Sequence, residues 1–361
     1  MTLEPATQQG GWKVSKGMRA IVAAAGIAAA GCLLLAGCGG STPAATKAEP
    51  TVVIGYENNG ADPEMAAMAQ GYFAKYMKGA HVELRYFSSG PASLAALASG
   101  SLQFMTGLGN PPAAAAIGQG VPLKVIWAQE LYTKDEGLVV RQGSNVHSLK
   151  DLEHKSIALV VGSTSPFEVA TAMAQEGIPA SSINFVNMSP PDMVSAWERG
   201  QLDAAYVWDP AFDTMLRHQG YALMYDQDVA QEAPIFNLAV VQGPWAKSHR
   251  QLVLGFIQAE QAGVAYAQSH PAQALRDMAK EAGITAALAK TELAGYRILS
   301  LQDQIGPNGL GSGDGVKTSL VTRSLSSAAK YLASIRQIPN APTNMSSYVD
   351  PSYAQAVAAN P

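Results

Sequence analysis

Short apolar runs rich in β-branched residues alternate with alanine-rich stretches along most of the chain, and this alternation constrains the fold more than any other feature. The apolar runs have the length of strands, and the alanine-rich stretches have the length and composition of helices. Strands that alternate with helices imply sheets whose strands are mainly parallel, with helices on both faces. We therefore predict an α/β fold.

The alternating pattern occurs twice and is followed by a helical third of the chain. The first set predicts strands at 52–55, 82–87, 104–106 and 123–128 around helices at 64–77, 93–98 and 113–119. The second set predicts strands at 137–140, 157–161, 184–187, 204–207 and 238–241 around helices at 167–175 and 193–198. Helices are then expected at 244–269, 271–282, 285–299 and 316–337, before Pro339, Pro342 and Pro351 break the tail.

An internal echo supports two similar α/β lobes. "ALASGSLQF" (96–104) and "AWERGQLDA" (196–204) share Ala, Gly and Leu at equal offsets. Each should close a helix, turn on Gly100 or Gly200, and enter a strand. Chance similarity in an alanine-rich chain is the alternative. Because ligands lie outside the carboxyl ends of strands in open sheets, two such lobes facing each other would form a binding cleft.

The N-terminus has the pattern of an export signal. Lys13, Lys16 and Arg19 precede an apolar run at 20–36, and small residues lead up to Cys38. The Leu-Ala-Gly-Cys ending resembles a bacterial lipoprotein signal, in which the cysteine becomes the acylated first residue. We therefore predict a lipoprotein signal peptide at 1–37, lipidation at Cys38, a flexible tether at 38–50, and a periplasmic or extracytoplasmic protein anchored to the membrane. An uncleaved membrane helix is the alternative.

Composition and motifs exclude several functions. With 361 residues, 48% of them hydrophobic, the chain can bury a large core, and a net charge of −4 without clustered Lys and Arg argues against nucleic-acid partners. Cys32 and Cys38 both precede the predicted folded part, which excludes a disulfide framework and a cysteine metal site there. The histidines lack metal-ligand spacing, and hydrolase motifs are missing. We expect no enzyme activity, no metal and no cofactor.

Four corners have the composition of helix N-termini that could face an anion. Each combines Ser, Thr or Asn with proline, at 88–91, 109–112, 163–166 and 189–192. They predict either a shared anion site built from helix dipoles and hydroxyl groups or simple helix capping. A fifth stretch, "DAAYVWDP" at 203–210, ends a predicted strand with Trp208 and Asp209. Ligand contact and a capping or hinge role for Asp209 both remain open.

Several motifs resemble one known family. "GYENNGADPEMA", "FSSGPASLAALASGSLQFMTGLGNPP", "VVGSTSPFEVATAM" and "MSPPDMVSAWERGQLDAAYVWDPA" are similar to the taurine-binding branch of the substrate-binding proteins of ABC importers, over about 51–348. The resemblance implies a two-lobed periplasmic-binding-protein fold of type II, with mixed, mainly parallel sheets, a ligand cleft between the lobes and two hinge crossovers. It assigns 51–139 and 238–350 to lobe 1 and 140–237 to lobe 2, in a monomer.

The resemblance also implies the binding residues. The sulfonate should lie against Asn110 and the serine and threonine hydroxyls at 163–165, and Glu57 and Glu136 should line the cleft. Asn237 stands where the taurine branch carries the acid that holds the amine, and loss of that charge-assisted bond costs ~1.5–3 kcal/mol. Glu57 or Asp209 could compensate. The full predicted ligand-binding set is Glu57, Ser89, Asn110, Glu136, Ser163, Thr164, Ser165, Trp208, Asp209 and Asn237.

The resemblance implies a solute-binding lipoprotein that captures taurine or a related small sulfonate and delivers it to the permease and ATPase of an ABC importer, without making or breaking a bond. The alternatives are alkanesulfonate, nitrate, bicarbonate or thiamine-pyrimidine binding proteins of the same fold, or a component that presents a ligand to a membrane sensor. Thiamine-pyrimidine synthesising enzymes are similar in fold, but they need a cysteine-rich iron site and a reactive histidine that this chain does not offer.

Overall fold

A computed structural model describes residues 49–360. The predicted signal peptide, Cys38 and the tether up to residue 48 lie outside the described residues, so these expectations stay predictions. Within residues 49–360, no helix combines the length and apolar character needed to cross a bilayer.

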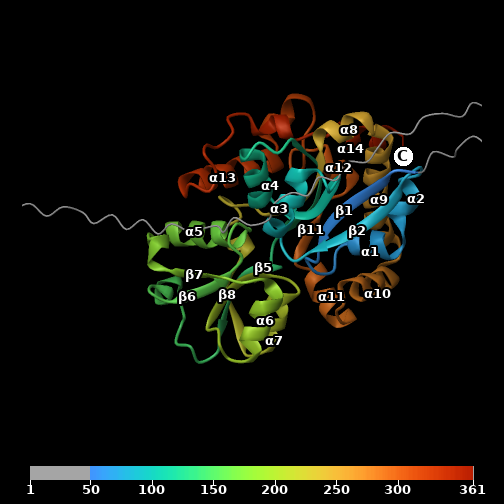
Figure 1. The fold of residues 1–361 in the computed structure, drawn as a ribbon. Coiled ribbons are helices and arrows are strands. Elements are labelled where there is room, and N and C mark those ends of the chain that lie inside the picture. Colours follow the sequence, from blue (N-terminus) through green and yellow to red (C-terminus); the bar gives the residue numbers. More distant parts are fainter. Residues whose placement is uncertain (1–48, 361) are drawn as a thin grey trace, which may run out of the picture. The chain divides into compact units, whose positions relative to one another are not determined.

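Two sheets organise the described chain (Figure 1). The first sheet has the order β11-β4-β10-β3-β1-β2, and the second has the order β7-β6-β8-β5-β9. The strands of the first sheet are β1 (Thr51–Glu57), β2 (His81–Phe87), β3 (Phe104–Gly109), β4 (Leu123–Tyr132), β10 (Phe236–Gln242) and β11 (Tyr296–Ile298). Those of the second sheet are β5 (Glu136–Arg141), β6 (Ser156–Leu159), β7 (Asn184–Asn187), β8 (Ala204–Trp208) and β9 (Gly220–Tyr225).

The two sheets repeat one topology. Counted from β1 in the first sheet and from β6 in the second, the second strand flanks the first and the third lies on its other side. One antiparallel strand, β10 or β5, separates the third from the fourth. The internal echo lies at equivalent places in this repeat. Gly100 and Gly200 both adopt φ of about +70°, at 74° and 70°, and end the helices that precede β3 and β8. In both copies the residue after the glycine donates its N–H to an alanine carbonyl, that of Ala96 or Ala196.

The chain crosses twice between the sheets, and each crossover leads directly into the antiparallel strand, β5 or β10. β4 of the first sheet leads through residues 133–135 into β5 of the second, and β9 leads through residues 226–235 back into β10 of the first. The crossovers contact each other, since the Gln227 N–H donates to the Thr133 carbonyl at 3.2 Å. The predicted fold class, with mixed sheets and two crossovers, is confirmed. The division at 139/140 and 237/238 stays a prediction, although sheet membership begins at Glu136 for β5 and at Phe236 for β10.

Helices cover both faces of the sheets because buried residues on the strands alternate in direction. Val52 and Ile54 pack in one apolar cluster with α1, α9, α10 and α14, while Val53 packs in the other with α4 and α13. In the second sheet, α5 lies on one side and α6 and α7 on the other (Figure 1). The helices are α1 (Pro63–Ala69), α2 (Tyr72–Tyr76), α3 (Gly90–Ser99), α4 (Asn110–Gly118), α5 (Ser165–Gln175), α6 (Pro190–Glu198), α7 (Ala211–Arg217), α8 (Gly243–Ser248), α9 (Arg250–Ser269), α10 (Pro271–Ala282), α11 (Ala286–Leu293), α12 (Leu301–Gln304), α13 (Leu320–Ser334) and α14 (Ser352–Ala359).

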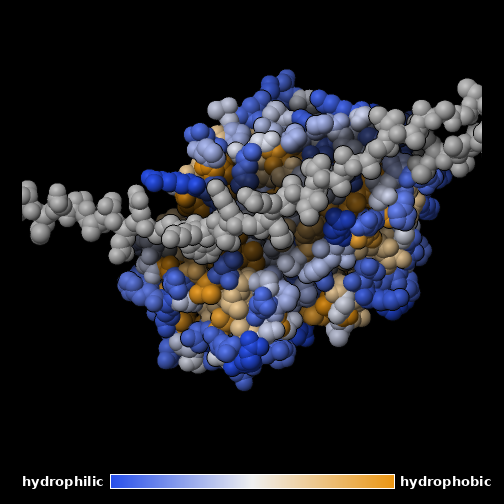
Figure 2. Space-filling model, viewed as in Figure 1, coloured by the Kyte–Doolittle hydropathy of each residue, from blue (hydrophilic) through white to orange (hydrophobic). Residues whose placement is uncertain are grey.

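The structure corrects several predicted elements. The expected helix at 64–77 breaks into α1 and α2 because Gly71 adopts φ 65°. The expected helix at 285–299 ends at Leu293, and Tyr296–Ile298 instead pairs with β4 as a short edge strand. The tail after Pro351 was expected to be broken by prolines, yet it forms α14, since proline is well tolerated just before a helix. The surface seen in Figure 2 is largely hydrophilic, with small hydrophobic patches.

Candidate functional site

A small, partly open cavity lies between the two sheets, at the carboxyl ends of β1, β3 and β8. We call it the interlobe cavity. Residues of both sheets and of three helix N-termini line it, as the open-sheet rule predicts. The lining residues are Glu57, Asn59, Gly90, Gly107, Gly109, Pro112, Tyr132, Glu136, Ser163, Thr164, Trp208 and Asn237. Six of the ten predicted ligand-binding residues are therefore on its wall: Glu57, Glu136, Ser163, Thr164, Trp208 and Asn237.

Three of the four predicted corners reach the interlobe cavity. Gly90 begins α3, Gly109 precedes α4, and Thr164 precedes α5, so the positive ends of these helices meet there. The fourth corner does not take part. Ser189 caps α6 by accepting from the Asp192 N–H at 3.4 Å, and the start of α6 lines a neighbouring cavity instead. Three corners thus reach one cavity and the fourth caps a helix, and the shared anion site stays a prediction.

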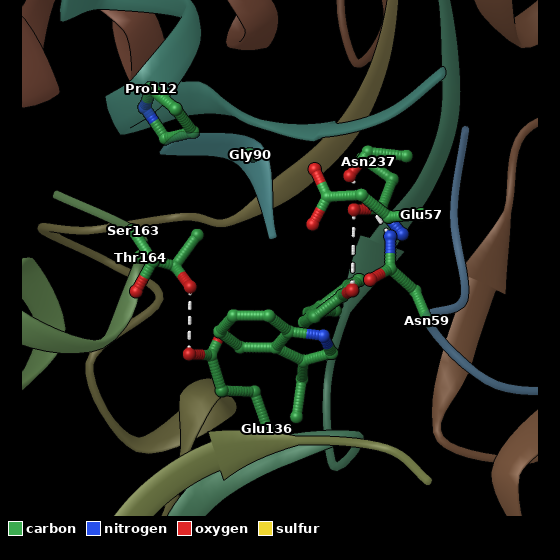
Figure 3. A pocket seen from close by; sticks show the side chains of 12 residues that line it. Glu57, Asn59, Gly90, Pro112, Glu136, Ser163, Thr164 and Asn237 are labelled. Atoms are coloured by element: carbon green, nitrogen blue, oxygen red, sulfur yellow. Dashed lines mark hydrogen bonds between the residues drawn. The ribbon is translucent and has the colours of Figure 1, made fainter. Parts of the chain in front are cut away.

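The hydroxyl groups of the 163–165 turn make hydrogen bonds inside the protein. Thr164 Oγ1 and Ser165 Oγ each donate to Glu136 Oε1 at 2.7 Å, and Figure 3 shows the Thr164 hydroxyl turned toward the Glu136 carboxyl group. Ser163 Oγ donates to the Val160 carbonyl at 2.8 Å and accepts from the Ser165 N–H at 3.2 Å. The turn therefore donates hydrogen bonds to Glu136 and also lines the cavity. Ser165 itself lies behind the cavity wall.

Two carboxyl groups face the cavity from opposite lobes. Glu57 ends β1 and Glu136 begins β5, and their side chains lie on different sides of the view in Figure 3. Burial raises the pKa of Glu57 well above its usual range, although the Gly90 N–H opposes this by donating to the carboxyl group. Burial also raises the pKa of Glu136 to about 7, opposed by the hydroxyls of Thr164 and Ser165. Glu57 Oε1 and Glu136 Oε2 make no hydrogen bond within residues 49–360.

No basic side chain compensates these acids. Within the part of the chain that the structure describes, every buried charged residue is Asp or Glu. Because a buried carboxylate is costly without a partner, the cavity favours either protonated acids or a cationic group from a ligand. The same cavity offers helix N-termini to an anion. This combination suits a small molecule that carries both charges.

Asn237 is held in one orientation by two neighbours. Its Nδ2 donates to Glu130 Oε1, and its Oδ1 accepts from the Tyr132 hydroxyl at 3.2 Å. Glu130 lies behind the wall and is 1% exposed, and burial raises its pKa well above the usual range. Asn237, which stands where the resemblance expects an acid, therefore has the acid Glu130 directly behind it. Tyr132 also lines the cavity, although its place in the apolar run gave no sign of this.

Asn110 and Ser89 do not line the interlobe cavity. Asn110 is fully buried, accepts from the Phe236 N–H at 3.3 Å, and donates to the Pro234 carbonyl at 3.4 Å. It therefore ties the start of α4 to the second crossover. Ser89 precedes α3 without a side-chain capping bond, and the wall is formed by its neighbour Gly90.

At the strand end "VWDP", Trp208 and Asp209 have different surroundings. Trp208 is 5% exposed and lines the interlobe cavity. Asp209 does not line it, since its Oδ1 accepts from the Asp213 N–H at 2.9 Å at the start of α7. Its backbone N–H donates to the carbonyl of Asp135 in the first crossover at 2.8 Å. Asp209 therefore makes a capping bond to α7 and a backbone contact to the first crossover, and its role in ligand contact stays a prediction.

The structure adds Asn59, Tyr132 and Gly107 to the predicted wall. Asn59 Nδ2 donates to the Gly107 carbonyl at 2.9 Å, which joins the segment after β1 to β3. The motif "GYENNGADP" could have indicated Asn59, because it continues the chain beyond Glu57 at a strand end. Within residues 49–360, no group of three or more His, Cys, Asp and Glu is arranged to hold a metal ion.

Comparisons with known proteins agree with this geometry. The family model described as "NMT1/THI5 like" matches residues 58–274. The taurine-binding periplasmic protein of Escherichia coli K12 is 35% identical over 206 residues, which span 57% of this chain and 62% of that protein. The match therefore covers less than two thirds of that relative's length.

Solved structures share the fold at lower identity. The alkanesulfonate-binding protein SsuA from Xanthomonas axonopodis pv. citri, bound to MOPS, has a TM-score of 0.69 at 20% identity, covering 84% of this chain and 99% of its own. The desulfurization enzyme DSZB has a TM-score of 0.61 at 11% identity, covering 86% and 99%. The fold thus occurs in both binding proteins and an enzyme.

Proposed function

Because the chain belongs to the NMT1/THI5-like family, we infer that it is an extracytoplasmic binding protein of an ABC importer that captures a small zwitterionic sulfonate, taurine before others. One relative in Escherichia coli is a taurine-binding periplasmic protein, which supports this ligand and location. The protein is not an enzyme in this proposal, and Cys38 carries the lipid anchor that holds it near the permease and ATPase.

The observation that carries the proposal is the pairing of opposite features in one cavity. The N-termini of α3, α4 and α5 provide partial positive charge for a sulfonate, and Glu136 provides a carboxyl group for an ammonium. Taurine separates these two charges by only two carbon atoms, and the same small cavity presents both features. Trp208 packs its indole against that short alkyl chain.

Binding closes the lobes on the ligand in this proposal. Gly109 of the first sheet lies close to Thr164, which precedes α5. The Tyr331 hydroxyl on α13 donates to the Pro166 carbonyl on α5 at 3.0 Å. These contacts connect the two lobes on the cavity side, and a ligand that touches both walls would stabilise them.

Calorimetric titration of the purified protein tests the function. We expect taurine to bind more tightly than ethanesulfonate, which has the sulfonate but lacks the amine, and both to bind more tightly than nitrate. Equal affinity for the two sulfonates would show that the amine is not recognised, and would favour an alkanesulfonate importer. Tight binding of nitrate, or of a thiamine-pyrimidine precursor, with no response to sulfonates would overturn the proposal.

A further inference from the structure

A second buried glutamate lies directly behind Glu136. Glu168 occupies the first turn of α5, and both side chains are completely buried. Their carboxyl groups are within hydrogen-bond reach of each other. Glu136 lines the interlobe cavity, whereas Glu168 does not.

The hydrogen-bond inventory of this pair requires a proton. Glu136 Oε1 accepts two hydroxyl groups, but Glu136 Oε2, both oxygens of Glu168 and the Tyr206 hydroxyl beside Glu168 make no hydrogen bond within residues 49–360. Two adjacent carboxylates with no positive charge near them would be costly in a buried site, even with the two hydroxyl donors to Glu136. One proton between them satisfies Glu136 Oε2 and neutralises one group. Because two hydroxyls already stabilise the Glu136 anion, the first proton belongs to Glu168, and Glu136 takes up a second proton only as the pH falls toward its pKa of about 7.

The surrounding groups reinforce this assignment. Asp226, at the start of the second crossover, accepts from the Glu136 N–H at 3.3 Å and adds a further acid. Tyr206 on β8 faces Glu168, and Glu57 faces Glu136 across the cavity. All of these neighbours are acidic or neutral. Burial raises the pKa of Glu168 well above its usual range, and nearby Glu136 and Asp226 raise it further, whereas the Tyr206 hydroxyl opposes this shift.

We propose that Glu168 is a positioning residue that stays protonated and donates to Glu136, and that Glu136 in turn releases its own proton when a ligand ammonium enters the interlobe cavity. This inference rests on the proposed function and adds a proton linkage to it. Protonated Glu168 stabilises the Glu136 carboxylate by donating a hydrogen bond to it. The ligand ammonium then favours ionisation of Glu136 by pairing with this carboxylate.

The protons balance in a single exchange. Before binding, Glu136 carries its proton in the fraction of molecules set by the solution pH. The ammonium ion pairs with the carboxylate and keeps its own three protons, and the Glu136 proton leaves to solvent. Glu168 keeps its proton throughout. Affinity for an ammonium-bearing ligand therefore decreases as the pH falls below the pKa of Glu136, by up to about tenfold for each pH unit.

Calorimetry with taurine between about pH 6 and pH 9 tests the linkage, in phosphate and in Tris, whose ionisation enthalpies differ. We expect the dissociation constant to be roughly tenfold weaker at pH 6 than at pH 8. At the lower pH, the heat should differ between the buffers by an amount that corresponds to release of up to about one proton. Ethanesulfonate should show no proton release.

Variants separate the role of Glu168 from a merely structural one. Glu168→Gln keeps a neutral donor toward Glu136, so its pH profile should match that of the unmodified protein. Glu168→Leu removes the donor at similar volume, which should move the profile to higher pH and weaken taurine binding about tenfold at neutral pH, with recovery near pH 9. Glu292→Gln, which replaces a buried acid outside the cavity, is the matched control and should not move the profile.

The outcomes are distinguishable. Taurine binding with an unchanged dissociation constant across this pH range and no buffer dependence would overturn the inference and leave the proposed function standing. A strong effect of Glu168→Gln would show that Glu168 is ionised, which also overturns it. Failure of every sulfonate to bind would defeat the proposed function and, with it, the proton release. Infrared difference spectra of the ligand-free protein against Glu168→Gln then decide separately whether Glu168 carries a protonated carboxyl group.

Discussion

The two glutamates on the cavity wall differ in how easily they ionise. Glu136 receives two hydroxyl donors, and its pKa is about 7, whereas burial and the acids nearby hold the pKa of Glu57 well above the usual range. At neutral pH Glu57 is therefore a neutral acid that can donate to a sulfonate oxygen, and Glu136 is the group available to an ammonium. One wall residue thus serves each end of the proposed ligand.

This difference predicts unequal effects of two otherwise identical substitutions. Glu136→Gln removes the carboxylate and should weaken taurine binding by roughly 10- to 100-fold, as expected for loss of a charge-assisted hydrogen bond of ~1.5–3 kcal/mol. Glu57→Gln mimics the protonated acid and should change the affinity by less than about threefold. Calorimetry at about pH 8 measures both. A larger effect at Glu57 than at Glu136 would show that the amine lies against the first lobe.

At the scale of single elements, two adjacent residues at the end of β8 make different kinds of contact. Trp208 faces the cavity, and Asp209 accepts from an N–H at the start of α7. We expect Asp209→Ala to lower the free energy of unfolding by ~1 kcal/mol through loss of the cap, and to leave taurine affinity nearly unchanged. Thermal melting and calorimetry of the same sample measure the two quantities. Asp209→Asn keeps the acceptor and serves as the control. A loss of affinity without a loss of stability would assign Asp209 to the ligand instead.

The start of α4 limits how closely the lobes approach. A Cβ atom at Gly109 would lie 2.8 Å from Thr164 Cγ2 across the cavity mouth. Gly109→Ala should therefore hinder closure and weaken taurine binding by about tenfold, as expected for a clash of ~1–3 kcal/mol between lobes. Gly315→Ala, where an added Cβ meets nothing within 4 Å, is the matched control and should bind normally. Unchanged affinity in Gly109→Ala would mean that the lobes bind taurine without this contact.

Sequence patterns predicted the strands and corners better than the hydrogen-bond partners of individual polar side chains. Strand periodicity and Gly-Pro corners are local signals, and they placed Trp208 at a strand end, whereas Glu57 and Glu136 were expected only from the family resemblance. The hydroxyls at 164 and 165 were expected to face the ligand, but they donate to a glutamate on β5, which is distant in sequence. Tyr132 was missed because its run predicts only a buried strand. Such pairings depend on tertiary contacts that no local pattern encodes.

At the scale of the whole molecule, buried acids without basic partners are the dominant electrostatic feature of the described chain. Burial raises the pKa of Glu64 and of Glu292 to about 8, of Asp209 to about 7, and of Asp62 to about 6. These acids occur in both lobes. Their folded-state pKa values lie above the unfolded values, so folding favours the protonated forms.

This arrangement predicts an unusual pH dependence of stability. The contribution of these acids is fully present below their unfolded pKa values, near pH 4, and it is lost as the pH rises toward about 8 through the folded values. The ligand-free protein should therefore melt at a higher temperature at about pH 5 than at about pH 8. Thermal melting across this range, monitored by circular dichroism, measures the trend. A melting temperature that rises from pH 5 to pH 8 would show that these acids are ionised in the folded protein.

The crossovers also bear on the order in which the protein can assemble as the chain emerges. All strands of the second sheet lie in one continuous segment, from Glu136 to Tyr225. In the first sheet, β3 and β4 remain separated until β10, which ends at Gln242, fills the gap between them. The first sheet therefore cannot be completed until β10 has been synthesised. The second sheet, although it begins later in the chain, can be completed before the first.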